Sequence, residues 1–148
     1  MSSLTFASQL VYIRHMKNYR TYVLAMRHYI DAAHQLPDSE SLTTKKCCNL
    51  HGHTYAIDVE LIEPDVNHDG FVLDFGTIKS LLDQFDHTFL NEHEAFKNKP
   101  TTAENFARVI FEVLSTICTV HLVRVCEGYR GFTNSKWVEY GNTGKATS

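Results

Sequence analysis

The sequence predicts an α+β domain in which two helices pack on one face of a four-stranded antiparallel sheet. Apolar and polar residues alternate over residues 51–63, which is typical of a half-buried strand. Apolar residues recur at helical spacing over residues 75–85 and 101–117. The predicted order is strand, strand, helix, helix, strand, strand, and it favours an antiparallel sheet with helices on it over an alternating α/β fold.

Four segments have the composition of β-strands, being rich in β-branched and aromatic residues: 21–33, 51–63, 121–126 and 136–140. The first two are separated by residues 35–50, which contain Pro37, Asp38 and several hydroxyl side chains and therefore predict a loop. Residues 67–70 predict a turn, and residues 71–73 are placed to continue the hairpin.

Two segments predict helices. Asp74 is placed to act as the N-cap of a helix over residues 75–85, and a long polar loop follows over residues 86–100. Thr101 and Glu104 have the spacing of a capping box and open a second helix that runs to about Ile117. The apolar face of this helix has six members: Phe106, Val109, Ile110, Val113, Leu114 and Ile117.

The 148 residues are enough for one domain, with a core over residues 21–140 and an N-terminal extension over residues 1–20. No apolar run approaches the roughly 18 residues that cross a bilayer. The net charge of −3 gives no basic field for nucleic acid. We therefore expect neither a membrane nor a nucleic acid as partner. Two open sheet edges favour a homo-oligomer.

The four cysteines do not have the spacing of a secreted disulfide scaffold, because Cys47 and Cys48 are adjacent. This arrangement favours a reducing, cytoplasmic setting. It also makes a thiol near histidines a candidate for catalysis or metal binding.

Three histidines form the candidate metal site. His51 and His53 are two residues apart on a predicted strand, so both imidazoles lie on one face. His34 ends the preceding strand and converges on them if the two strands pair. Three neutral imidazoles are the ligand set of a catalytic zinc that keeps its fourth position open. The alternative is that these are hydrogen-bonded core histidines.

Cys47 and Cys48 precede His51 closely enough for one thiol to reach the edge of such a site without ligating the metal. A nearby cation lowers the pKa of a thiol, so the thiolate is a candidate base. The competing interpretation, a closed site with two cysteines and two histidines, requires separated cysteine pairs.

Six short motifs occur in order along residues 22–140: Ala32-Ala33-His34, Cys47-x-x-x-His51-Gly52-His53, Gly70-x-Val72-x-Asp74-Phe75, Asp86-His87-x-x-Leu90-Asn91, Pro100-Thr101 with Glu104-Asn105, and Glu127 after an apolar strand. Together they resemble the zinc-dependent pterin synthases, the family of 6-pyruvoyltetrahydropterin synthase and 6-carboxytetrahydropterin synthase. Within this family, the spacing of Cys47 and His51 is similar to that of the bacterial carboxytetrahydropterin branch.

The resemblance implies that Zn²⁺ is held by His34, His51 and His53. It also implies that Cys47 is the proton acceptor, although the adjacent Cys48 leaves a one-position ambiguity.

It further implies that Asp86 and His87 exchange protons with the substrate. By the same resemblance, Glu127 is expected to accept hydrogen bonds from the pterin ring and to join the catalytic relay. Glu104 and Asp74 also match family motifs, but we interpret both as helix-capping residues. The chain departs from the family pattern over residues 128–132, after Glu127.

The fold implied by the resemblance is the tunnelling fold, in which three sheets close into a barrel and two trimers stack into a hexamer with sites between subunits. The implied activity is a lyase that converts 7,8-dihydroneopterin triphosphate to 6-carboxytetrahydropterin, releasing acetaldehyde and triphosphate, in queuosine biosynthesis. Three alternatives remain: the pyruvoyl product formed by triphosphate elimination, a zinc hydrolase with an incidental cysteine, and a non-catalytic oligomer that binds zinc or pterin.

Overall fold

The computed structural model describes residues 20–131 and 136–142. Most of the predicted N-terminal extension, residues 1–20, lies outside the described residues. The described part contains one sheet with strand order β3-β1-β2-β4-β5. Its strands are β1 (Tyr22–His34), β2 (His51–Glu63), β3 (Thr88–Phe89), β4 (Val120–Cys126) and β5 (Val138–Gly141). No helix among the described residues is long and apolar enough to span a membrane.

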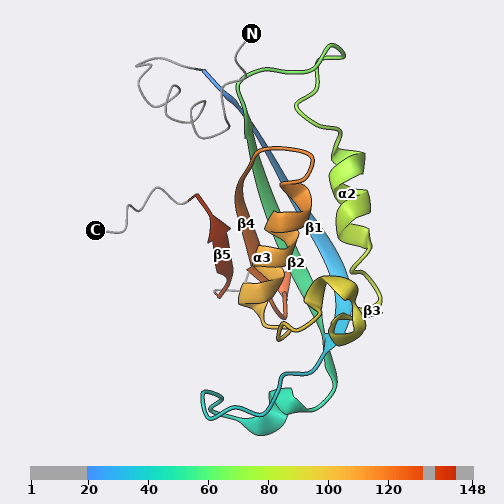
Figure 1. The fold of residues 1–148 in the computed structure, drawn as a ribbon, viewed down its shortest axis with the longest axis vertical. Helices are drawn as coiled ribbons and strands as arrows, with labels where there is room; N and C mark the ends of the chain where they lie inside the picture. The colour runs from blue at the N-terminus through green and yellow to red at the C-terminus, as the bar shows by residue number, and fades with distance from the viewer. Residues whose placement is uncertain (1–19, 132–135, 143–148) are drawn as a thin grey trace, which may run out of the picture.

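The longest feature is the antiparallel hairpin of β1 and β2 (Figure 1). The two strands pair along their whole length, from Tyr22 opposite Glu63 to His34 opposite His51. The connecting loop extends beyond the end of the sheet and contains a short 3₁₀ helix, η1 (Lys45–Cys48). This loop confirms the prediction for residues 35–50, apart from the 3₁₀ turn.

The sheet has five strands and is mixed, so the prediction of four antiparallel strands needs a small correction. The added strand, β3, is two residues long and pairs in parallel with Ala32 and Ala33 of β1. So short a segment carries no period-two pattern, and its pairing depends on tertiary structure. Residues 71–73 do not continue the hairpin as a strand.

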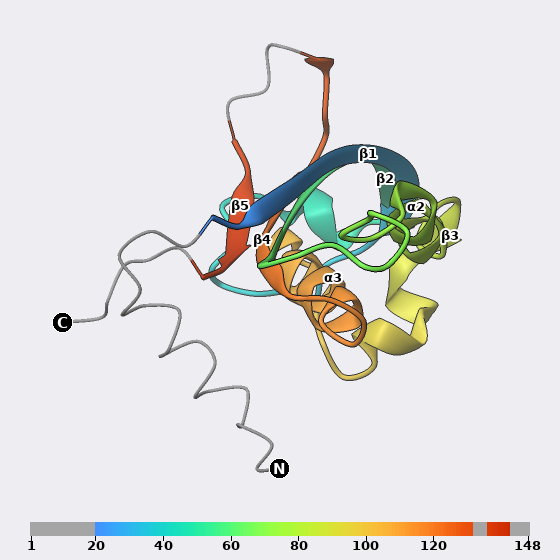
Figure 2. The ribbon, with the colours of Figure 1, turned by 90° about the horizontal axis from the view of Figure 1, so that it is seen from above.

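Two helices, α2 (Phe75–Asp83) and α3 (Ala103–Leu114), lie on the same side of the sheet (Figure 2). Both are shorter at their C-terminal ends than predicted. Two 3₁₀ turns, η2 (Leu90–Glu92) and η3 (Glu94–Phe96), connect β3 to α3. The element order and the α+β class are therefore as predicted.

One of the two predicted helix caps differs from the one observed. Thr102, rather than Thr101, caps α3, and its hydroxyl accepts a hydrogen bond from the Asn105 amide. Thr101 is instead 1% exposed, packed into the interior beside the sheet. Asp74 stands at the N-cap of α2, but its side chain makes no capping hydrogen bond. The capping-box interpretation of Glu104 is therefore wrong.

The core lies between the sheet and the two helices. Side chains alternate along the strands, so one face of β1, β2 and β4 is buried and the other is not covered by α2 or α3. The fully buried members of largest volume include Tyr55, Phe85 and Phe106, whose rings meet edge to face. The Tyr55 ring also lies edge to face against His34 and His53, so the core reaches the ends of β1 and β2 where the histidines lie.

A candidate metal centre

Three imidazoles meet where β1 ends and β2 begins. His34 is the last residue of β1 and pairs with His51, the first residue of β2, while His53 follows on the same face. The ring centroids are 4.5 Å apart for His34 and His51, 4.8 Å for His51 and His53, and 5.2 Å for His34 and His53. The structure thus brings together the three histidines grouped from the sequence.

Backbone carbonyls set the tautomers of two of these rings. His34 Nδ1 lies 2.7 Å from the Thr101 carbonyl oxygen, and His51 Nδ1 lies 2.7 Å from that of Asn49. A carbonyl can only accept, so each Nδ1 carries the hydrogen and each Nε2 of the neutral ring is left with a lone pair. The two Nε2 atoms are 3.0 Å apart. This arrangement, with Nδ1 held by a carbonyl and Nε2 free to ligate, is typical of metal-binding histidines.

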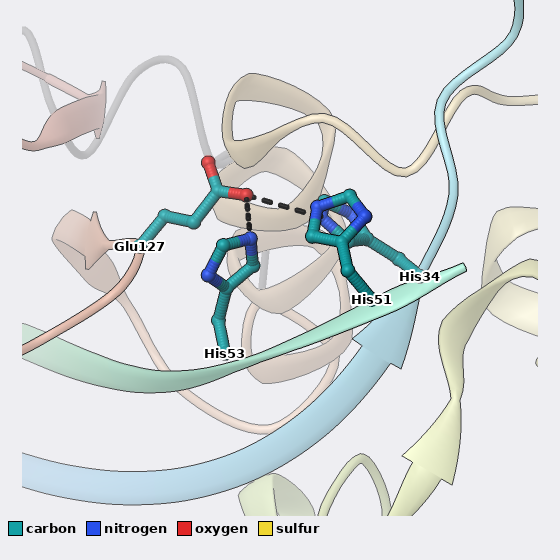
Figure 3. A group of neighbouring side chains, drawn as sticks. All are labelled: His34, His51, His53 and Glu127. Atoms are coloured by element: carbon teal, nitrogen blue, oxygen red, sulfur yellow. Dashed lines mark hydrogen bonds and ion pairs between the residues drawn. The ribbon is translucent and has the colours of Figure 1, made fainter. Parts of the chain in front are cut away.

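Glu127 joins this cluster from the end of β4 (Figure 3). Its Oε1 atom lies 2.9 Å from His53 Nε2 and 3.1 Å from His34 Nε2. The second carboxylate oxygen points away from the histidines. The ligand atoms of all four residues lie within 4.8 Å of one another. The sequence predicts a role for Glu127 in substrate binding and in the catalytic relay, and its place beside the metal ligands is a finding of the structure.

The electrostatics of the cluster suit a cation. Burial lowers the pKa of His53 and outweighs the opposing effect of Glu127, which favours the neutral imidazole that metals bind. The contact of its Oε1 with His34 Nε2, together with the neighbouring histidines, lowers the pKa of Glu127 and keeps its carboxylate ionised. Three imidazole nitrogens and one carboxylate oxygen are ligands that Zn²⁺ accepts, so the residues present fit this metal.

Asp86 and His87 form a second polar pair, just before β3. His87 Nδ1 lies 2.8 Å from Asp86 Oδ2, and this contact raises the pKa of the imidazole. The pKa of Asp86 is lowered, first by a hydrogen bond from the Asp31 amide and also by His87. His87 has φ of 54°, in the left-handed region that non-glycine residues rarely adopt.

Two cavities lie beside these groups, and His53 of the metal cluster lines the same one as His87. A cavity of about 390 Å³ is lined by His34 and Glu127, by the first turn of α3, and by apolar side chains that include Leu36, Leu42 and Val138. A second cavity, of about 610 Å³, is lined by His87 together with residues of β1, β2 and β3. Asp31 and Thr54 in its wall alternate with the histidine positions along the strands. Their side chains therefore lie on the sheet face opposite the metal cluster.

Cys47 and Cys48 lie in η1, and both thiols are half-buried. Neither cysteine belongs to the four-residue cluster or lines either cavity. The structure therefore groups the predicted residues in three places: the three histidines with Glu127, Asp86 with His87, and Cys47 alone in the loop before β2.

Glu104 is a residue that the sequence analysis set aside. Its spacing from Thr101 predicts a capping box, yet Glu104 lines the 390 Å³ cavity together with His34 and Glu127. The available signal was its place in a family motif, and the capping explanation outweighed that signal. Thr101 belongs to the same predicted capping box and family motif, and the structure shows that its carbonyl orients His34.

The family model described as 6-pyruvoyl tetrahydropterin synthase matches residues 23–141. This chain belongs to that family. The family match spans the hairpin, both helices and all three groups of predicted site residues.

Individual relatives fall in both branches of the family. The 6-carboxy-5,6,7,8-tetrahydropterin synthase of Haemophilus influenzae is 37% identical over 57% of this chain and 75% of its own length. That of Bacillus subtilis is 33% identical over 57% of this chain, and the match spans 59% of the Bacillus protein. The structure of Caenorhabditis elegans 6-pyruvoyl tetrahydropterin synthase superposes with a TM-score of 0.63 at 27% identity, over 85% of this chain and 99% of that one.

Proposed function

We propose that this chain is a zinc-dependent lyase that converts 7,8-dihydroneopterin triphosphate and water to 6-carboxytetrahydropterin, acetaldehyde and triphosphate. The observation that carries the proposal is the pair of Nε2 atoms of His34 and His51, held 3.0 Å apart by carbonyl-bound rings inside a pterin synthase fold. Relatives named as carboxytetrahydropterin synthases support this branch.

His34, His51 and His53 are the residues that would hold the zinc. Zinc in such a site acts as a Lewis acid on oxygen atoms of a bound substrate. The chain's own contribution is orientation: Thr101 and Asn49 fix two of the rings through their carbonyls, so little reorganisation accompanies binding.

Glu127 and the 390 Å³ cavity are suited to a pterin ring. The cavity combines apolar walls from Leu36, Leu42 and Val138 with a carboxylate at its edge. An aminopyrimidine presents two parallel N–H groups, and a carboxylate accepts both through its two oxygens. We propose that Glu127 turns toward the ring when substrate binds. Glu104 in the same wall offers a second carboxylate.

Cys47 is proposed as the base and the Asp86–His87 pair as the proton shuttle. The paired carboxylate keeps the imidazole oriented and more readily protonated, as general acid–base chemistry requires. Cys48 is not expected to substitute for Cys47.

The position of the Asp86–His87 pair suggests that the site is shared between copies of the chain. His87 shares its cavity with His53 but not with His34 or Glu127, which line the other cavity, so we propose that Glu127 and His87 meet one substrate only when two copies of the chain come together. The long edge of β1 beyond its contact with β3 is available for pairing with another chain. A hexamer made of two trimers is the proposed assembly. The four free thiols support a cytoplasmic location.

The alternative activity is formation of the pyruvoyl product from the same substrate, by elimination of triphosphate without loss of two carbons. The match to the Caenorhabditis elegans enzyme favours this second candidate. The mass of the pterin product and the presence of acetaldehyde distinguish the two reactions.

The test is product analysis by mass spectrometry after incubating zinc-loaded protein with 7,8-dihydroneopterin triphosphate. We expect 6-carboxytetrahydropterin and acetaldehyde from the wild type and from Cys48→Ala, and loss of product in Cys47→Ala with zinc retained. Full turnover by Cys47→Ala would favour a hydrolase in which the cysteine is incidental. No product from folded, zinc-containing wild type would favour a non-catalytic binding protein.

A further inference from the structure

Asp31 contacts the Asp86–His87 pair from two sides through its main chain. Its amide donates to Asp86 Oδ1 over 2.8 Å, and its carbonyl accepts from the His87 amide over 2.7 Å. The next residues continue the attachment, because β3 pairs in parallel with Ala32 and Ala33. The segment that carries the pair is therefore fixed to β1, three residues before His34.

His87 has a left-handed backbone conformation, which a histidine does not favour by itself, so the attachment to β1 must maintain it. A φ of 54° at a histidine costs free energy unless surrounding contacts maintain it. The Asp31 carbonyl holds the His87 amide, and Asp86 holds the ring. The imidazole itself is 80% exposed and projects into the cavity.

The Asp31 side chain is oriented separately. Its Oδ1 atom accepts a hydrogen bond from the Thr54 hydroxyl over 2.5 Å, across the β1–β2 pair. Asp31, Thr54 and His87 line the same 610 Å³ cavity. The carboxylate is thus held in the wall of the cavity into which the imidazole projects.

We propose that Asp31 is a positioning residue for the Asp86–His87 pair: its main chain maintains the strained His87 backbone, and its Thr54-oriented carboxylate stabilises the protonated imidazole in the cavity. The inference deepens the proposed lyase function and rests on it for its catalytic meaning.

Few charged groups other than Asp31 lie near the His87 imidazole. Asp86 contacts His87 directly, and the titratable residues among the described lining of the cavity are Asp31, His53 and His87. Asp31 adds to the effect of Asp86 in raising the pKa of His87. Removing the charge of Asp31 therefore should lower that pKa, while Asp86 continues to hold the ring.

Asp31→Asn removes the charge of residue 31 but keeps its hydrogen bond, because the asparagine oxygen still accepts from the Thr54 hydroxyl. Thr54→Val does the opposite: it keeps the charge of Asp31 and removes the hydrogen bond that orients the Asp31 carboxylate. Glu60→Gln is the matched control, a neutralised carboxylate further along the same face of β2. Each zinc-containing variant is titrated by NMR on histidine-labelled protein, with the His87 signal assigned by its absence in His87→Ala.

We expect Asp31→Asn to lower the pKa of His87, Thr54→Val to lower it less, and Glu60→Gln to leave it unchanged. In the lyase assay, kcat of Asp31→Asn should fall roughly tenfold, with its pH profile displaced in the same direction and KM unchanged. An unchanged His87 pKa in both folded variants would overturn the proposal. If the wild type turns over no pterin substrate, the proposed function fails, and the NMR titration still decides the role of Asp31.

Discussion

The Nε2 atoms of His34 and His51 lie 3.0 Å apart, and the hydrogen of each neutral ring is committed to a backbone carbonyl on its other side. Two lone pairs facing each other at this distance repel unless a cation lies between them. His53 and the Glu127 carboxylate complete a group whose ligand atoms converge. A metal ion is the simplest way to stabilise this arrangement.

Metal content should depend on the three histidines and not on histidines in general. We expect one zinc per chain in the wild type and loss of bound zinc in His51→Ala, measured by elemental analysis after dialysis. His68→Ala is the matched control, because the His68 side chain is 88% exposed and its ion pair among the described residues is with Asp69. Equal zinc content in both variants would contradict the assignment.

Removing the metal should lower thermal stability, because the ion binds the folded cluster and not the dispersed histidines. At a free zinc concentration 100 times Kd, the expected stabilisation is about 2.7 kcal/mol. Thermal unfolding with and without a chelator measures it. A chelator that lowers the unfolding temperature of His51→Ala as much as that of the wild type would show a site elsewhere.

Glu127→Gln distinguishes a substrate carboxylate from a metal ligand. We expect zinc to be retained by the three histidines, while kcat/KM falls roughly 10- to 100-fold through loss of a charged hydrogen bond to the pterin. The measurement combines zinc affinity with steady-state kinetics. Weaker zinc binding with an unchanged KM would instead identify Glu127 as the fourth ligand.

Acid should destabilise the contact between β1 and α2. Asp83 accepts hydrogen bonds from Lys79 and from His28, and these lower its pKa. The unfolded chain then binds more protons at low pH, so this stabilisation is present above the ordinary aspartate pKa of about 3.9 and is lost as pH falls through the lower, folded value. Urea unfolding between pH 6 and pH 3 should show a weaker pH dependence in Asp83→Asn. The same pH dependence in the wild type and in Asp83→Asn would show that Asp83 does not contribute to the loss of stability in acid.

The core beneath the site should be sensitive to truncation. Phe106 is 1% exposed and packs edge to face on Tyr55, whose ring also contacts His34 and His53. Phe106→Ala should lower the free energy of unfolding by about 3–5 kcal/mol. Ile117→Ala, at a 48% exposed position, should change it by less than about 0.5 kcal/mol. Chemical denaturation compares the two, and equal losses would contradict this description of the core.

The features that were predictable from sequence are those encoded by local periodicity. The alternation over residues 51–63 placed His51 and His53 on one face, and pairing with β1 then brought His34 opposite His51. The position of Glu127 depended on the register of β2 against β4, in which Ala56 faces Cys126. No local pattern encodes that register, so the approach of Glu127 to the histidines was not predicted.

Other errors have the same physical origin. The hydroxyls of Thr101 and Thr102 are equally able to cap a helix, and burial of Thr101 beside His34 decides between them. β3 forms because β1 has an open edge at Ala32 and Ala33. A strand of two residues is too short to be predicted from its own sequence. The strained backbone of His87 depends on Asp31, far from it in the chain.

Zinc-dependent turnover of 7,8-dihydroneopterin triphosphate tests the central claim most directly. Protein stripped of metal is titrated with Zn²⁺ while 6-carboxytetrahydropterin and acetaldehyde are quantified by mass spectrometry. We expect activity to rise in proportion to added zinc, to reach its limit at one zinc per chain, and to be absent from His34→Ala. Undiminished turnover by the metal-free protein, or by His34→Ala, would contradict the claim that this cluster is the centre of the reaction.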